Sequence, residues 1–123
     1  MATFKRFEEI KAWQKAREAT REVYKQTLKA TFARDFGLRD QIQRSAVSVM
    51  ANIAEGFGRH SDKDFANFLN VAHASMSESQ SHLYVALDLG YTNQTDFTRL
   101  YDMFDEVSRM TMALAKHLRT ARA

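Results

Sequence analysis

The segment Ser45-Ala-Val-Ser-Val-Met-Ala-Asn-Ile-Ala-Glu-Gly-Phe-Gly-Arg59 decides the fold of this chain. Its apolar residues recur every three or four positions, which is the periodicity of a helix. Gly56 and Gly58 follow, and glycine commonly ends a helix by adopting left-handed backbone. The segment therefore predicts the end of one helix, a short turn and the start of the next helix.

The rest of the chain is also predicted to be helical. It holds 123 residues with four glycines and no proline, so few positions interrupt a helix. The first apolar seam consists of Ile10, Trp13, Ala16, Val23, Tyr24 and Leu28. Three further seams at helical spacing follow it. Together they predict helices over about 7–28, 38–57, 62–87 and 94–119.

The turns carry capping residues at the expected places. Ser61 with Asp64, and Asn93 with Asp96, have the spacing of helix N-caps followed by an acid in the first turn. Gly90 is placed to end the third long helix. Four helices joined by short connections predict a single domain over 1–123, an all-α, up-down-up-down antiparallel four-helix bundle.

Two of these helices have more apolar surface than one core needs. A helix that is apolar nearly all round is buried on more than one side. In a domain of this size, the second side predicts a subunit interface and hence a homo-oligomer. The residues concerned are Val47, Met50, Ala51 and Ala54 on the second helix and Phe68, Val71 and Val85 on the third.

Positive charge gathers near the two ends of the sequence. Residues 1–34 have a net charge of +5, residues 35–108 of −6 and residues 109–123 of +4. The predicted topology returns the fourth helix to where the first begins, so both basic segments meet at one end of the bundle. The nucleic-acid-binding residues expected there are Lys5, Arg6, Lys11, Lys116, Arg119 and Arg122.

Motifs of catalysis and metal binding are missing from the sequence. Without cysteine there is no disulfide, thiolate site or cysteine nucleophile, and no glycine-rich phosphate loop or nucleophile elbow is present. No Glu-x-x-His pair occurs, and Glu78 with His82 supplies too few metal ligands. We expect no enzyme, metal, cofactor or small-molecule substrate. No apolar run is long enough to span a membrane, so we expect a cytoplasmic protein.

Three polar residues lie in otherwise apolar or small segments: Asn52, Glu55 and Glu78. Buried carboxylates must be paired or hydrogen-bonded to be tolerated. We interpret the three as a buried structural network at the turn between the second and third long helices, with Arg44 and Arg59 among the possible partners. A ligand-binding or catalytic role for them is the alternative.

Residues 48–59 resemble the family named for the 23S rRNA intervening sequence, also labelled S23 ribosomal protein. The similarity continues through Ser61, Phe65 and Leu89-Gly90-Tyr91, and upstream around Trp13 and Leu38. It implies an up-down-up-down bundle that assembles into a ring, typically a homopentamer. The family usually has proline where this chain has Met50, and proline would kink the second helix. The name of the family points to RNA without defining an activity.

These observations predict a non-enzymatic oligomeric bundle that binds rRNA or other nucleic acid through a basic rim. The alternative is a protein–protein scaffold or accessory subunit with no nucleic-acid role, in which the basic residues serve solubility.

Overall fold

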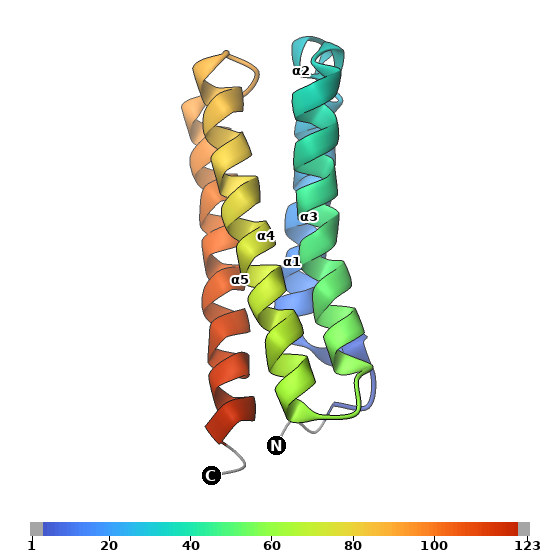
Figure 1. Cartoon of the computed structure of the whole chain (residues 1–123). Helices are drawn as coiled ribbons and strands as arrows, with labels where there is room; N and C mark the ends of the chain where they lie inside the picture. Colours follow the sequence, from blue (N-terminus) through green and yellow to red (C-terminus); the bar gives the residue numbers. More distant parts are fainter. Residues whose placement is uncertain (1–3, 121–123) are drawn as a thin grey trace.

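Four long helices make up most of the protein. The computed structural model describes residues 4–120, in which α1 covers Lys11–Thr27, α3 Phe36–Phe57, α4 Asp62–Asp88 and α5 Gln94–Thr120. A 3₁₀ turn, η1 (Phe7–Glu9), precedes α1, and a short helix, α2 (Ala30–Arg34), joins α1 to α3. The long helices run antiparallel (Figure 1), each packs against the next, and α5 also packs against α1. The predicted all-α antiparallel bundle is confirmed.

The core is built from the apolar seams. The seam predicted for the third long helix is buried at every position: Phe65, Leu69, Ala72, Met76, Ser79, Leu83 and Ala86. The seam predicted for the fourth is buried except at Leu114, which is half-buried; its other members are Phe97, Leu100, Phe104, Val107, Thr111 and Leu118. The end of the first seam was predicted wrongly, because Tyr24 and Leu28 are 40% and 77% exposed. α1 ends at Thr27, and Phe32 from α2 fills the core at this end instead, with 1% exposure.

The first long helix begins four residues later than the sequence predicts. Ile10 has extended backbone and is buried, so the chain turns before α1 begins. The Gln14 side chain donates a hydrogen bond of 2.8 Å to the Glu8 carbonyl and holds this turn. Phe7 then packs edge-on against Trp13, with 5.0 Å between ring centroids. The burial of Ile10 and the packing of Phe7 on Trp13 therefore stabilise the protein more than one further turn of helix would.

The glycines act differently from one another. The prediction of left-handed backbone at Gly56 and Gly58 is wrong, since Gly58 has a φ of −76° and Gly56 lies within α3. Gly90, with a φ of +75°, is the one residue of the described range with positive φ. It allows the Tyr91 amide to donate a 2.9 Å hydrogen bond to the Ala86 carbonyl and so close α4.

The predicted N-caps are confirmed. The Ser61 hydroxyl accepts from the Asp64 amide at 3.1 Å, and the Asn93 side chain accepts from the Asp96 amide at 2.7 Å. Asp35 supplies a third cap that the sequence analysis did not identify, because it accepts from the amide at position 38 at 3.1 Å. These caps satisfy amides that have no partner within the helix.

The interface between α3 and α4 contains hydroxyl pairs among its small residues. The Ser45 and Ser79 hydroxyls lie 2.7 Å apart, and those of Ser48 and Ser75 lie 3.0 Å apart. Within residues 4–120, every buried side-chain polar atom has a hydrogen-bond partner. The interface therefore combines close helix approach with satisfied polar groups.

Candidate nucleic-acid interface

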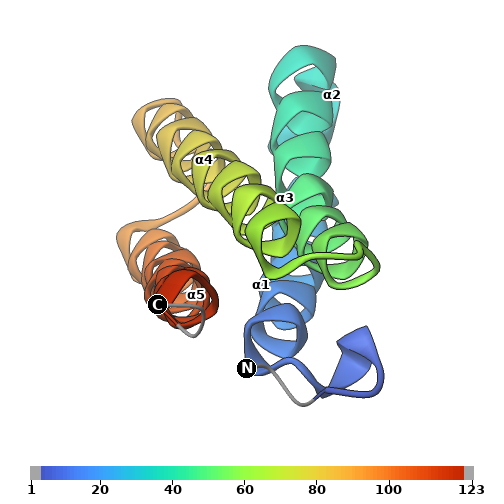
Figure 2. The ribbon, with the colours of Figure 1, turned by 60° about the horizontal axis from the view of Figure 1, so that its bottom comes forward.

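Three parts of the chain meet at one end of the bundle. Figure 1 places the start of α1, the turn between α3 and α4 and the end of α5 together, and Figure 2 shows this end from a lower viewpoint. We call it the basic end and define it as residues 4–11, 58–63 and 116–120. The antiparallel topology brings both basic segments of the sequence to the same place, as predicted.

The predicted basic residues within the described range are all exposed: Lys5, Arg6, Lys11, Lys116 and Arg119. Arg122 lies outside the described residues. Arg6 forms an ion pair with Glu8 at 3.2 Å. The hydrogen bond with Glu8 raises the pKa of Arg6, and the pKa of Glu8 is lowered in return. Glu8 therefore offsets the charge of Arg6 locally.

The other basic side chains of this group remain available. Among the described residues, Lys5, Lys11, Lys116 and Arg119 form no side-chain ion pair. Some carboxylates share the basic end, including Glu9, whose side chain accepts from the Lys5 backbone amide at 3.3 Å. The positive charge of this end is therefore moderate, and its ammonium and guanidinium groups are free to meet an anion.

Three basic residues at the opposite end, Lys25, Lys29 and Arg99, are paired with carboxylates. Glu22 lies 2.7 Å from Arg99 and 3.2 Å from Lys25, and Asp96 lies 3.2 Å from Lys29 and 3.3 Å from Arg99. The hydrogen bond from Arg99, and then that from Lys25, lowers the pKa of Glu22. The pKa of Asp96 is lowered chiefly by Lys29. The Glu22–Arg99 pair connects α1 to α5, the Lys29–Asp96 pair connects the residue before α2 to α5, and together they offset the charges of Lys29 and Arg99.

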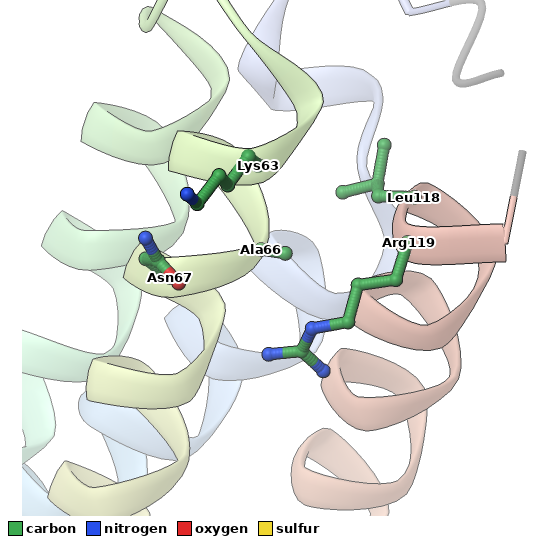
Figure 3. Close-up of a pocket in the computed structure, with 5 residues that line it drawn as sticks. All are labelled: Lys63, Ala66, Asn67, Leu118 and Arg119. Carbon is green, nitrogen blue, oxygen red and sulfur yellow. The ribbon is translucent and has the colours of Figure 1, made fainter. Parts of the chain in front are cut away.

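A shallow hollow of about 310 Å³ lies between α4 and α5 at the basic end. Figure 3 shows Lys63 and Asn67 on α4 and the Arg119 side chain extending from α5 toward α4, with the Lys63 ammonium directed away from α5. Ala66 and Leu118, each 1% exposed, complete the lining. Sequence reasoning selected Arg119 but missed Lys63. Lys63 could have been identified from the topology, because the bundle places the turn before α4 beside both basic segments.

The three singled-out polar residues do not form one buried cluster. Asn52 donates to the Ser48 hydroxyl at 2.9 Å and so joins the hydroxyl pair between α3 and α4. Glu55 pairs with Arg59 at 2.7 Å and Glu78 lies 3.3 Å from His82, each along its own helix. Both glutamate side chains are 57% exposed. The predicted burial of Glu55 and Glu78 is therefore wrong for the single chain.

The second apolar surfaces lie on the outside of the bundle. Val47, 40% exposed, lies on α3, and Val71 and Val85, 49% and 42% exposed, lie on α4. An apolar hollow of about 270 Å³ opens on the first of these surfaces. Its lining consists of Phe7, Trp13, Val47, Met50, Ala51 and Ala54. α3 is continuous through Met50, so this surface follows one unbroken helix.

Residues 4–120 contain no group of three or more His, Cys, Asp or Glu side chains arranged to hold a metal ion. In the same range, no helix combines the length and apolar character that crossing a membrane requires.

The fold and its surfaces define a small antiparallel helical bundle with a basic end and exposed apolar faces. The chain belongs to the 23S rRNA-intervening sequence protein family, whose sequence model matches residues 8–113. It is also similar to the crystal structure of a protein of unknown function from the S23 ribosomal protein family of Bacteroides thetaiotaomicron VPI-5482. That likeness has a TM-score of 0.77 at 25% identity and covers 85% of this chain and 98% of the other. The curated proteins include no significant match.

Proposed function

We propose that this protein is a non-enzymatic, cytoplasmic bundle that assembles into a homopentameric ring and binds rRNA or other nucleic acid. The observation that carries the binding proposal is the contrast between the two ends of the bundle. At the basic end Arg6 and Arg59 are paired, but Lys5, Lys11, Lys116 and Arg119 form no ion pair with the described residues. At the opposite end Lys25, Lys29 and Arg99 all pair with carboxylates. Unpaired basic side chains bind phosphates by releasing counterions.

The exposed apolar surfaces support the assembly proposal. The hollow around Val47 and Met50 belongs to α1, α3 and η1, whereas Val71 and Val85 project from α4. Two different surfaces that fit each other produce a head-to-tail contact between copies, and such contacts close into a ring when the rotation allows it. The number five rests on the resemblance of the sequence to its family.

Assembly would strengthen weak binding by each protomer. Five chains of net charge +3 carry +15 in total. When one contact is made, the remaining copies are held close to the same polyanion, so their binding becomes intramolecular. A moderate charge on each basic end is then sufficient for affinity.

The binding proposal is tested with a labelled fragment of 23S rRNA at low salt. We expect binding that weakens as salt rises and is lost in the variant Lys5→Glu, Lys11→Glu, Lys116→Glu. Arg34→Glu is the matched control, because Arg34 is exposed and lies in α2, away from the basic end. Absence of binding by the unchanged protein, or equal loss in the control, would overturn the proposal.

The apolar hollow favours one alternative function, a scaffold whose partner is another protein. The nucleic-acid-binding ring and the protein scaffold can be distinguished by measuring the mass by light scattering. The absorbance at 260 and 280 nm is read on the same peak. A mass near five protomers with excess absorbance at 260 nm supports a ring that carries nucleic acid. A monomer that purifies with one protein in fixed ratio, without nucleic acid, supports the scaffold.

A further inference from the structure

The hollow between α4 and α5 differs chemically from the other hollows at the surface. Its lining includes two cations, Lys63 and Arg119, and one amide, Asn67, but no carboxylate. The hollow that contains Arg59 and His60 also contains Asp62, and Arg59 is already paired with Glu55. Of these two hollows, the one between α4 and α5 is therefore better suited to an anion.

A second basic hollow lies along α1 but is less suitable. Arg17 and Arg21 share it with the carboxylate of Glu18. The Arg17 guanidinium also lies 5.9 Å from the centre of the Trp13 ring. An anion there would meet Glu18 at close range, and like charges repel.

We propose that Lys63, Asn67 and Arg119 form a phosphate-binding site that holds one nucleotide of a bound nucleic acid. This inference rests on the proposed function and names the place on the basic end where a phosphate is held. Of its three polar members, sequence reasoning selected Arg119 alone, because Lys63 and Asn67 lie on α4, outside the two basic segments of the sequence.

The donors match the ligand. A guanidinium can donate two parallel hydrogen bonds to a phosphate, and an ammonium adds a compact charge with three donors. The side-chain amide of Asn67 can add one more donor. Lys63 and Asn67 are four residues apart on α4, so both side chains stand on the same face of that helix. Arg119 reaches the site from the neighbouring helix (Figure 3).

The size and floor of the hollow favour a nucleotide over a bare ion. Its volume of about 310 Å³ lies at the lower end of the range for small-molecule sites, roughly 300–1,000 Å³. Ala66 and Leu118 close the floor but are each only 1% exposed, so a sugar or base would pack chiefly on the aliphatic stems of Lys63 and Arg119 above them. A phosphate with its attached nucleoside uses both the cationic groups and these stems.

The test compares Lys63→Gln/Arg119→Gln with Arg34→Gln in binding to a labelled single-stranded RNA. Hydrogen bonds to charged groups contribute roughly 1.5–3 kcal/mol. We therefore expect the double variant to bind at least about tenfold more weakly. Its slope of log affinity against log salt should fall by about one for each phosphate that the variant no longer neutralises. Lys63→Arg keeps the charge and should retain most of the affinity, and circular dichroism verifies that each variant is folded.

A second measurement tests the site without RNA. Uridine monophosphate is titrated into isotope-labelled protein, and the backbone amide signals of Ala66, Asn67 and Arg119 are followed by TROSY NMR. We expect shifts at these amides in the unchanged protein and none in the double variant. Inorganic phosphate should give smaller shifts, because it has no sugar or base to pack on the stems.

The outcomes separate the two proposals. RNA binding that survives the double substitution, without nucleotide-induced shifts, overturns the phosphate site and leaves the proposed function standing. Nucleotide-induced shifts without any RNA binding overturn the proposed function and keep a site for free nucleotides. Equal losses in Arg34→Gln show binding by overall charge alone and overturn the site.

Discussion

Gly56 of α3 lies so close to Phe68 of α4 that a β-carbon on the glycine would stand 2.7 Å from the Phe68 β-carbon. The same added carbon would lie 3.0 Å from the Phe65 ring and 3.3 Å from the Phe65 carbonyl oxygen. These neighbours include backbone and the base of a side chain, which cannot move aside cheaply. Glycine at this position therefore sets the distance between the two helices.

We predict that Gly56→Ala destabilises the protein. Overpacking a well-filled interface typically costs about 1–3 kcal/mol. Alanine favours the helix by up to about 1 kcal/mol, which offsets part of that cost. Because the 2.7 Å contact places the cost in the upper half of that range, we expect a net loss of about 1–2 kcal/mol in the free energy of unfolding, measured by urea denaturation.

Gly37→Ala is the control for this substitution. Gly37 also lies in α3, but an added β-carbon meets only the Asp35 carboxylate, at 3.8 Å. We expect no loss of stability and a gain of up to about 1 kcal/mol. If Gly56→Ala and Gly37→Ala behave alike, the close approach at Phe68 is not what requires glycine.

Gly90→Ala should destabilise for a different reason. Nothing lies within 4 Å of an added β-carbon there, but the φ of +75° is costly for any residue with a side chain. We expect a loss of about 1–2 kcal/mol in urea denaturation. Gly90→Asn should lose less, because asparagine tolerates left-handed backbone better than alanine. Equal losses in both variants would show that the backbone conformation is not the cause.

The buried Ser45–Ser79 pair can be tested by a double-mutant cycle. Each hydroxyl also lies within hydrogen-bond distance of a backbone carbonyl of its own helix, Ser45 of Ile42 and Ser79 of Ser75. Each hydroxyl has one proton, so while one serine donates to the other, only the accepting serine can donate to its carbonyl. We expect either single alanine substitution to cost about 1 kcal/mol. The double substitution should cost less than the sum, with a coupling of about 0.5 kcal/mol or more. Ser77→Ala, at an exposed position of α4, should change stability by less than about 0.5 kcal/mol.

The ion pairs that connect α1 and Lys29 to α5 predict a pH dependence of stability. Their partners hold the pKa values of Glu22 and Asp96 below the ordinary 4.5 and 3.8. Because the folded pKa values are lower, the stabilisation is present above the unfolded pKa values. It is lost as the pH falls through the folded ones. The melting temperature of the unchanged protein should therefore fall below about pH 5.

Arg99→Gln isolates this contribution. Arg99 is 44% exposed, so solvent screening limits the effect to at most about 1 kcal/mol. The variant should melt below the unchanged protein at pH 7, and the difference should shrink as the pH falls toward 3. A difference that stays constant over this range would contradict the assignment. Arg34→Gln, which removes an exposed α2 charge, should show no pH-dependent difference.

The sequence predicted what depends on periodicity and local capping. Seam residues such as Leu69 and Phe104 are buried, and Ser61 and Asn93 cap their helices, because these features follow from spacing along one helix. Contacts between segments far apart in the sequence could not be predicted from spacing along one helix. The role of Gly56 depends on how closely α4 approaches, and spacing within α3 does not reveal that distance.

The same distinction applies to the candidate site: its position in the fold was predictable from the sequence, but its side-chain contacts were not. Topology was sufficient to bring Lys11 and Lys116 to one end of the bundle. It did not reveal that Glu8 offsets Arg6, or that Glu55 and Glu78 are exposed, because those outcomes depend on side-chain directions. α2 was missed because its five residues, 30–34, are too few for a periodic pattern, although Phe32 anchors them in the core.

The packing of α5 against α1 has a consequence for synthesis on the ribosome. α1, α3 and α4 can pair in order as they emerge, since each contacts the helix made just before it. The side of α1 that receives α5 stays uncovered until the last helix has left the exit tunnel, and exposed apolar surface invites aggregation. α1, α3 and α4 are therefore complete before α5 can cover them, and that interval is when a chaperone that recognises apolar surface would find its substrate.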